Sequence, residues 1–245
     1  MFRFILLIYI IVCHLIKSLK SMINSLMQQQ RNAKQKQKQK QTNKNNNIKY
    51  TDTDELFIHH ARCGDFKHIK QILYNYRIDI NRNHSQALRL ASANGHYKTV
   101  KLLIQNGSKI NENADFALRY ASFNGHFDVV QLLVENGANI HAMNNFSLRV
   151  ACKFNFYNIT EYLLSKGANI ESFNNYAICN ASKNGNIDII KLLHKYGGNL
   201  RACNDYPYYI AMKFNHYKII DYLNKQGISL PKQHKIRIRK RSWSS

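Results

Sequence analysis

Apolar residues recur at helical spacing along most of the chain, in short segments separated by polar turns. In one such segment, Val129, Val130 and Leu133 lie on a common face, which predicts a helix over residues 127–135. The segment before it, residues 116–123, has the same character and predicts a second helix. The pattern therefore indicates pairs of short helices joined by tight turns.

The helix pair repeats every thirty residues without a gap, and one alanine marks each repeat. These alanines are Ala61, Ala91, Ala121, Ala151, Ala181 and Ala211. The six predicted repeats are 51–80, 81–110, 111–140, 141–170, 171–200 and 201–230. One such unit is too small to bury its own apolar face, so neighbouring repeats must cover it. Six repeats exceed the number of about three that a stable stack needs.

Turn residues recur in the same frame. Residues that tolerate positive φ stand between the two helices, at Gly95, Gly125, Asn155, Gly185 and Asn215. A glycine also follows each second helix, at Gly107, Gly137, Gly167, Gly197 and Gly227, which is typical of a helix C-terminus. Good N-cap residues precede the first helix, at Ser85, Asp115, Asn145, Asn175 and Asp205. These positions predict where each helix begins and ends.

The repeat resembles the ankyrin repeat. The residues N-G-H-x-x-V-V-x-L-L-x-x-N-G-A-N-I at 124–140 are similar to that family's second helix and exit loop. The thirty-residue period, with A-L-R-Y-A-S at 117–122, resembles the ankyrin proteins encoded by giant DNA viruses. The resemblance implies an all-α fold, a right-handed solenoid of helix-turn-helix units whose concave face binds proteins. The usual period is about 33 residues, so we expect short hairpin fingers between Gly137 and Ala151.

The family's partner-facing positions map onto the end of the first helix and onto the fingers. The candidate partner-binding residues are Phe123, Met143, Lys153, Phe154, Phe173, Lys183, Lys213 and Phe214. An exposed phenylalanine beside a lysine is a good anchor, since interface cores favour aromatic residues. The alternative is that these rings pack against the neighbouring repeat, and the sequence leaves both open.

Arg89, Arg119 and Arg149 recur once per repeat on the first helix, where the family places a histidine that holds the hairpin together. A ladder of guanidinium groups suits a possible contact with an anion, either an acidic peptide or a phosphate. The same groups also suit hydrogen bonds to loop carbonyls, and we favour this structural role.

Metal and enzyme chemistry receive little support from the sequence. His59, His60, Cys63 and His68 cluster in the first repeat, but zinc prefers a closed set of four ligands and no second cluster completes one. The sequence contains no nucleotide-binding, serine-hydrolase or zinc-protease motif. We therefore expect no catalytic residues, no metal and no cofactor.

Charge is concentrated in the predicted tails. The formal net charge is +22, yet residues 51–230 carry 20 basic and 14 acidic residues. The remaining basic residues lie in the segments before and after this range. Residues 28–50 form a low-complexity basic linker, expected to be a flexible spacer. The basic tail, 231–245, suits a nuclear-import signal or a phosphate contact, and equally a solvated end.

The first segment, residues 1–27, has an apolar run at 4–16 that is too short for a full membrane span. It is open to three interpretations: a signal or anchor, an interfacial or buried helix, or an over-long gene start before Met22 or Met27. The five cysteines contain no paired motif, which favours a reducing compartment.

Taken together, the sequence predicts a non-enzymatic, monomeric module for protein–protein interaction. The resemblance points to a viral protein that acts on host factors in the cytoplasm or nucleus. Two alternatives remain open: a membrane-tethered ankyrin protein, held through residues 4–16, and a nucleic-acid binder that uses its basic tails.

Overall fold

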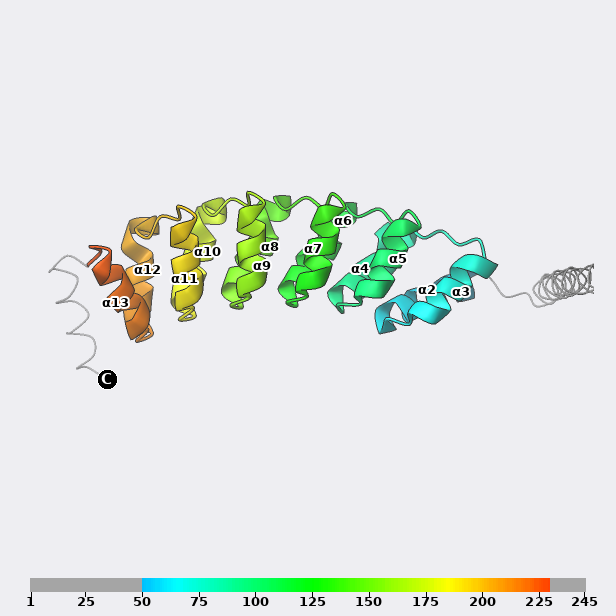
Figure 1. Cartoon of the computed structure of the whole chain (residues 1–245), viewed down its shortest axis with the longest axis horizontal. Coiled ribbons are helices and arrows are strands. Elements are labelled where there is room, and N and C mark those ends of the chain that lie inside the picture. The colour runs from blue at the N-terminus through cyan, green and yellow to red at the C-terminus, as the bar shows by residue number, and fades with distance from the viewer. Residues whose placement is uncertain (1–49, 230–245) are drawn as a thin grey trace, which may run out of the picture. The chain divides into compact units, whose positions relative to one another are not determined.

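Helices arranged in consecutive pairs make up the part of the chain described by this computed structural model, residues 50–229 (Figure 1). We call the first helix of each pair helix A and the second helix B. The helices A are α2 (Tyr50–Cys63), α4 (Arg82–Ala93), α6 (Glu112–Phe123), α8 (Ala142–Lys153), α10 (Ser172–Lys183) and α12 (Ala202–Lys213). The helices B are α3 (Phe66–Asn75), α5 (Tyr97–Gln105), α7 (Phe127–Glu135), α9 (Tyr157–Ser165), α11 (Ile187–Lys195) and α13 (Tyr217–Lys225). The predicted all-α stack of helix pairs is confirmed.

Three predicted segments lie outside the described residues: the apolar segment 1–27, the linker 28–50 apart from Tyr50, and the tail 231–245. Within residues 50–229, no helix has the length and apolar character needed to cross a membrane.

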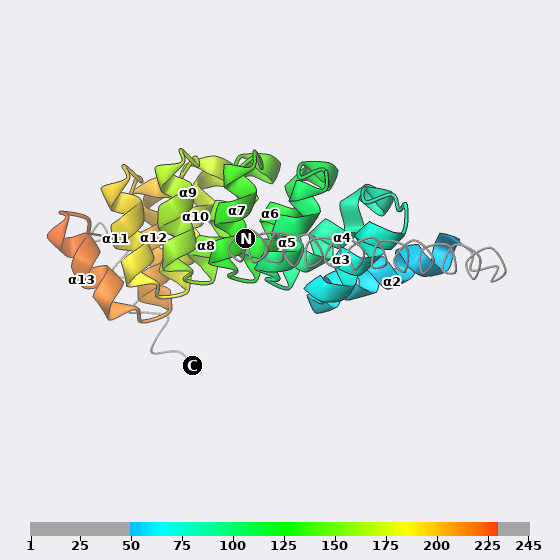
Figure 2. The same ribbon diagram turned by 45° about the vertical axis from the view of Figure 1, so that its right-hand side comes forward.

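The helices of successive repeats lie side by side in two layers (Figures 1 and 2). From α4 onward, each helix A contacts the helix A of the next repeat, and from α3 onward each helix B contacts the next helix B. Helix A also contacts helix B of its own repeat from α4 to α13. The first helices of the repeats therefore form one continuous surface.

The core runs between the two layers and through the recurring alanines. Ala91, Ala121 and Ala151 are completely buried, as are Leu118 of helix A and Leu133 of helix B. A methyl side chain at the alanine position lets adjacent helices approach closely, while the leucines fill the space between the layers. The alanine frame read from the sequence is thus a packing requirement.

The turn between helices A and B also joins neighbouring repeats. In repeat 3, Gly125 has a φ of +81°, as predicted for this position. The next residue, His126, donates from Nε2 to the carbonyl oxygen of Ala93 in repeat 2, at 3.0 Å. Asn124 Nδ2 donates to the same carbonyl at 2.6 Å. The N-G-H motif therefore caps the end of the preceding helix A.

Gly125 is required for two reasons, and Gly137 for one. A Cβ atom on Gly125 would lie 2.8 Å from the ring of Phe156, whereas one on Gly137, whose φ is +93°, would meet nothing within 4 Å. Gly137→Ala is expected to destabilise the protein by about 1–2 kcal/mol, from left-handed strain alone. Gly125→Ala is expected to lower the free energy of unfolding clearly more than Gly137→Ala does, as measured by urea unfolding. Equal losses of stability would show that the contact with Phe156 does not matter.

The connection between repeats differs from a hairpin finger. Near the start of each helix A from α4 to α12, three successive residues have left-handed backbone angles. In repeat 3 they are Asn113, Ala114 and Asp115 of α6, with φ from 53° to 55°. The same turn occurs in repeats 2 to 6. The shortening of the finger was expected, but its form is a single left-handed turn, and the described residues contain no paired strands. Such a turn costs about 1–2 kcal/mol for each non-glycine residue, so it needs compensating contacts.

The predicted N-cap role of the turn residues is wrong for Asp115 and Asn145. Asp115 Oδ1 accepts a hydrogen bond from the backbone N–H of Asn139 at 2.8 Å, and Asn145 Oδ1 accepts one from Asn169 at 2.9 Å. Neither side chain caps its own helix. Both hold the exit loop of their own repeat, 24 residues further along the chain.

Replacing Asp115 with asparagine is expected to stabilise the protein at pH 7. Burial raises the pKa of the Asp115 carboxyl, although the hydrogen bond from Asn139 and the charge of Arg119 oppose this. Its ionisation therefore destabilises the folded state, and the penalty disappears as the pH falls below its unfolded-state pKa of 3.8. Asparagine keeps the acceptor, as Asn145 shows. The difference in melting temperature between the wild type and Asp115→Asn should narrow from pH 7 to pH 4. A difference that stays constant would show that the titration of Asp115 is not its cause.

Candidate protein-binding surface

The exposed side of the helices A carries most of the large exposed apolar side chains of repeats 3 to 6. We define the helix A face as the exposed side chains of residues 83–94, 113–124, 143–154, 173–184 and 203–214. It includes Tyr120, Phe123, Met143, Phe154, Phe173, Tyr206, Tyr209 and Phe214, each between 37% and 59% exposed. All eight predicted partner-binding residues lie within these five segments. The tyrosines were not predicted, because only the end of each helix A and the fingers were considered.

Aromatic rings contact one another in a chain across repeats 3 and 4. Phe116 stacks on Tyr120 with ring centroids 3.9 Å apart, and Tyr120 is followed by Phe123 at 6.2 Å. Phe123 meets Phe154 of the next repeat edge-on, at 5.1 Å. Packing and exposure, the two alternatives left open for these phenylalanines, therefore coexist: Phe154 packs on Phe123 and is still 40% exposed. Contact between the rings restricts them before any partner arrives.

The three predicted ladder arginines hold the left-handed turns. Arg119 donates from Nε to the carbonyl oxygen of Ala114 at 2.8 Å and from Nη2 to that of Asn113 at 3.1 Å. Arg89 and Arg149 make the equivalent pair of bonds in repeats 2 and 4. The planar guanidinium group reaches two successive carbonyls at once, which a single ammonium group does not. These contacts compensate for the strain of the turn.

The same arginines lie over aromatic rings of the next repeat. The guanidinium carbon of Arg89 is 4.7 Å from the centroid of Phe116, and that of Arg149 is 4.6 Å from Phe173. Burial lowers the pKa of Arg149, and the nearby Tyr176 opposes this effect. The structural role of the arginines is thus clear, while their contact with an anion remains a prediction.

Arg119→Lys is expected to lower the free energy of unfolding by about 1–2 kcal/mol, because the flexible ammonium group lacks the rigidly spaced donors that reach both carbonyls at once. The exposed Lys183→Met serves as a control, with an expected change within about 0.5 kcal/mol. Chemical unfolding of the two variants beside the wild type measures both values. If Arg119→Lys leaves the free energy of unfolding unchanged, the turn does not depend on the guanidinium group.

The helix A layer carries more basic than acidic residues. Over their full bounds, the five helices A from α4 to α12 carry seven basic and three acidic residues, and one of the acidic ones, Asp115, is buried. The five helices B from α5 to α13 carry six basic and five acidic residues, and so nearly balance. On the helix A face, Lys153 Nζ lies 5.0 Å from the ring centroid of Phe154, and Lys213 Nζ lies 5.8 Å from that of Phe214. Cationic and aromatic groups therefore alternate on the same surface.

Comparison with known families is consistent with this architecture. A family model that comprises three ankyrin repeats matches residues 13–114, 56–144, 109–174 and 148–234. These matches overlap and together span most of the sequence. The chain belongs to the ankyrin-repeat family. A search of curated proteins returned no match to the sequence.

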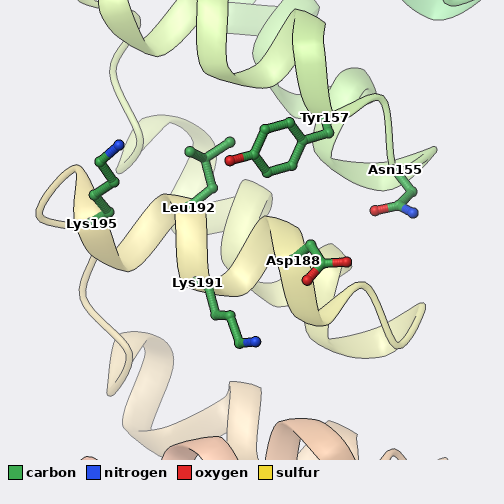
Figure 3. A pocket seen from close by; sticks show the side chains of 6 residues that line it. All are labelled: Asn155, Tyr157, Asp188, Lys191, Leu192 and Lys195. Atoms are coloured by element: carbon green, nitrogen blue, oxygen red, sulfur yellow. The ribbon is translucent and has the colours of Figure 1, made fainter.

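The opposite layer of the ankyrin stack offers a different kind of surface. A hollow beside α9 and α11 is lined by Asn155, Tyr157, Asp188, Lys191, Leu192 and Lys195 (Figure 3). In Figure 3 the ring of Tyr157 extends toward Leu192, while Asp188 and Lys191 project from α11. The hollow mixes both signs of charge and is lined by one aromatic ring, Tyr157, which is 41% exposed. Helices B supply the control substitutions used below.

The histidine cluster of the first ankyrin repeat is organised around Asp65, which sequence analysis did not include. Asp65 caps α3 by accepting from the backbone N–H of His68 at 3.2 Å, and this bond is the main reason that its pKa is lowered. His68 Nδ1 and His60 Nδ1 lie 2.6 and 3.4 Å from Asp65 Oδ2.

The two histidine rings are stacked at 4.7 Å and are nearly parallel, with an interplanar angle of 12°. His60, Asp65 and His68 offer ligand atoms that all lie within 4.8 Å of one another, but three ligands are fewer than the closed set of four that zinc prefers. His59 instead contacts Cys63, at 3.7 Å. The present geometry therefore serves to hold the capping carboxylate of Asp65.

Proposed function

We propose that this ankyrin protein binds an acidic segment of another protein through the helix A face of repeats 2 to 6. The observation that carries the proposal is the joint presence, on the helix A face, of exposed aromatic rings and basic side chains, while the two acidic residues of its segments, Asp115 and Asp205, are buried and half-buried. Ankyrin repeats generally mediate protein–protein interaction, which agrees with this use of the surface.

The two kinds of side chain have separate tasks in this proposal. Phe123, Phe154 and Phe214 accept apolar side chains of the partner, since partly ordered aromatic rings lose little conformational freedom on binding. Lys183 and Lys213 pair with carboxylates of the partner, which speeds encounter and selects against basic segments.

The setting of this interaction follows from the sequence resemblance to giant-virus ankyrin proteins, which makes a host protein the proposed partner. We expect the chain to act as a monomer in the cytoplasm or nucleus of the host. The two rival functions, tethering through residues 4–16 and nucleic-acid binding through the tails, depend on segments outside the described residues.

Selection from a random peptide library with the full-length chain tests the chemistry of the partner. We expect enriched peptides to combine several Asp or Glu residues with aromatic or aliphatic ones. Their affinity should fall as the salt concentration rises, because part of the attraction is between charges. Enrichment of neutral or basic peptides, or affinity that is independent of salt, would count against the proposal.

A further inference from the structure

The arginine contact of repeats 2 to 4 is replaced in repeat 5 by a cysteine of the following repeat. Position 179, which corresponds to Arg149, is a cysteine. The turn carbonyl that corresponds to Asn144 O, the acceptor of Arg149 Nε, is that of Asn174. Asn174 O accepts instead from Cys203 Sγ, at 3.2 Å. The Cys203 thiol therefore bonds the carbonyl oxygen whose counterpart in repeat 4 accepts from an arginine Nε.

This replacement brings two thiols together. Cys179 holds the sequence position of that arginine, and its side chain interacts with the thiol of Cys203. Burial, and after it the charge of the neighbouring Cys203 thiol and a hydrogen bond with it, raise the pKa of Cys179 to about 12. Both cysteines are free, and Cys203 is exposed. Cys179 also lines a surface pocket with Asn174 and Lys183, so a small reagent can reach the pair.

We propose that Cys179 and Cys203 form a reversible disulfide between repeats 5 and 6 when a small disulfide, such as oxidised glutathione, is present. The exposed Cys203 thiolate attacks one glutathione sulfur and displaces the first glutathione thiolate. The Cys179 thiolate then attacks the sulfur of Cys203, and the second glutathione leaves. One protein S–S bond forms, the glutathione S–S bond breaks, and the protons and electrons of two thiols pass to two glutathione molecules.

The order of the two steps follows from the environments of the two thiols. Cys203 is accessible and reacts first, while Cys179 must lose a proton that its raised pKa retains. Closure is therefore the slow step, and it accelerates as the pH rises. The resulting crosslink ties α10, at Cys179, to the left-handed turn at the start of α12, at Cys203, within the segments of the helix A face.

The test uses the full-length chain with Cys13→Ser and Cys63→Ser, which leaves Cys152, Cys179 and Cys203. The protein is exposed to oxidised glutathione at pH 8, denatured, alkylated and weighed by mass spectrometry. We expect one alkylated cysteine and no bound glutathione, a state that dithiothreitol reverses. Adding Cys179→Ser should stop the reaction at one glutathione, attached to Cys203.

Two results would overturn the proposal. If the protein with both thiols keeps glutathione on Cys203 to the same extent as the Cys179→Ser variant, the sulfur atoms do not meet. If all three cysteines remain open to alkylation, Cys203 is not the entry point. Peptide mapping of the oxidised chain identifies which cysteines are joined.

Discussion

Leu118→Ala is expected to lower the free energy of unfolding by about 3 kcal/mol, within the range of roughly 2–5 kcal/mol for a buried leucine. Leu118 is fully buried in α6, where it lies between the two layers in the middle of the stack. Its neighbours belong to regular helices and cannot easily close the cavity. Unfolding in urea, followed by circular dichroism, measures the loss.

The exposed Leu56, which is 49% accessible on α2, provides the matched control. Leu56→Ala removes the same atoms but leaves no cavity, so its expected change is below about 0.5 kcal/mol. Because the stability of a repeat array depends on each interface, Leu118→Ala should also broaden the transition by weakening the centre of the stack. Similar losses for both variants would show that the core does not run between the layers as described.

Reversal of charge on the helix A face is expected to weaken partner binding by about 100-fold or more. The triple variant Lys153→Glu, Lys183→Glu, Lys213→Glu replaces attraction by repulsion at each lysine. Even about 1 kcal/mol of binding free energy per site sums to a loss of about 100-fold in affinity. The control is Lys98→Glu, Lys191→Glu, Lys218→Glu on helices B, with the same change in net charge.

Isothermal titration of an acidic peptide, or of the captured partner, measures both affinities at the same salt concentration. The control variant should bind within about threefold of the wild type, since long-range attraction alone is screened over roughly 10 Å. If both variants lose affinity equally, net charge and not the helix A face governs binding.

Most of the fold could be predicted from the sequence, because each position of one repeat can be compared with the equivalent positions of five others. The helix from Phe127 to Glu135 has the predicted bounds, and Gly125 and Gly137 have the predicted positive φ. Each of these features depends on local propensity, on spacing or on the absence of a side chain. Such properties are read directly from residue types.

The connection between repeats was harder to predict, because its form depends on contacts across the fold. The short period indicated a reduced finger, but nothing in Asn113 and Ala114 specifies three left-handed residues in succession. Only the position of Arg119, six residues after Asn113, shows how the turn is held. The role of Asp115 escaped for the same reason, since its partner Asn139 lies 24 residues away.

The candidate binding surface was found in part. Phe154 and Phe214 stand out because they interrupt the recurring N-G pattern, and both are exposed. Tyr120 and Tyr209 are exposed on the same layer, yet their positions look like ordinary helix positions. The cysteine pair also escaped, because 24 residues separate Cys179 from Cys203.

The central claim, that the helix A face binds the partner, is tested most directly by capture from a cell lysate with two matched variants of the full-length chain. Phe154→Ala, Phe214→Ala removes two exposed rings from that face, and Tyr157→Ala, Tyr217→Ala removes two exposed rings from helices B. Equal thermal stability of the two variants is required first. We predict that the wild type and the helix B variant retain the same protein and that the helix A variant loses it. Loss in the helix B variant, with retention in the helix A variant, would contradict the claim.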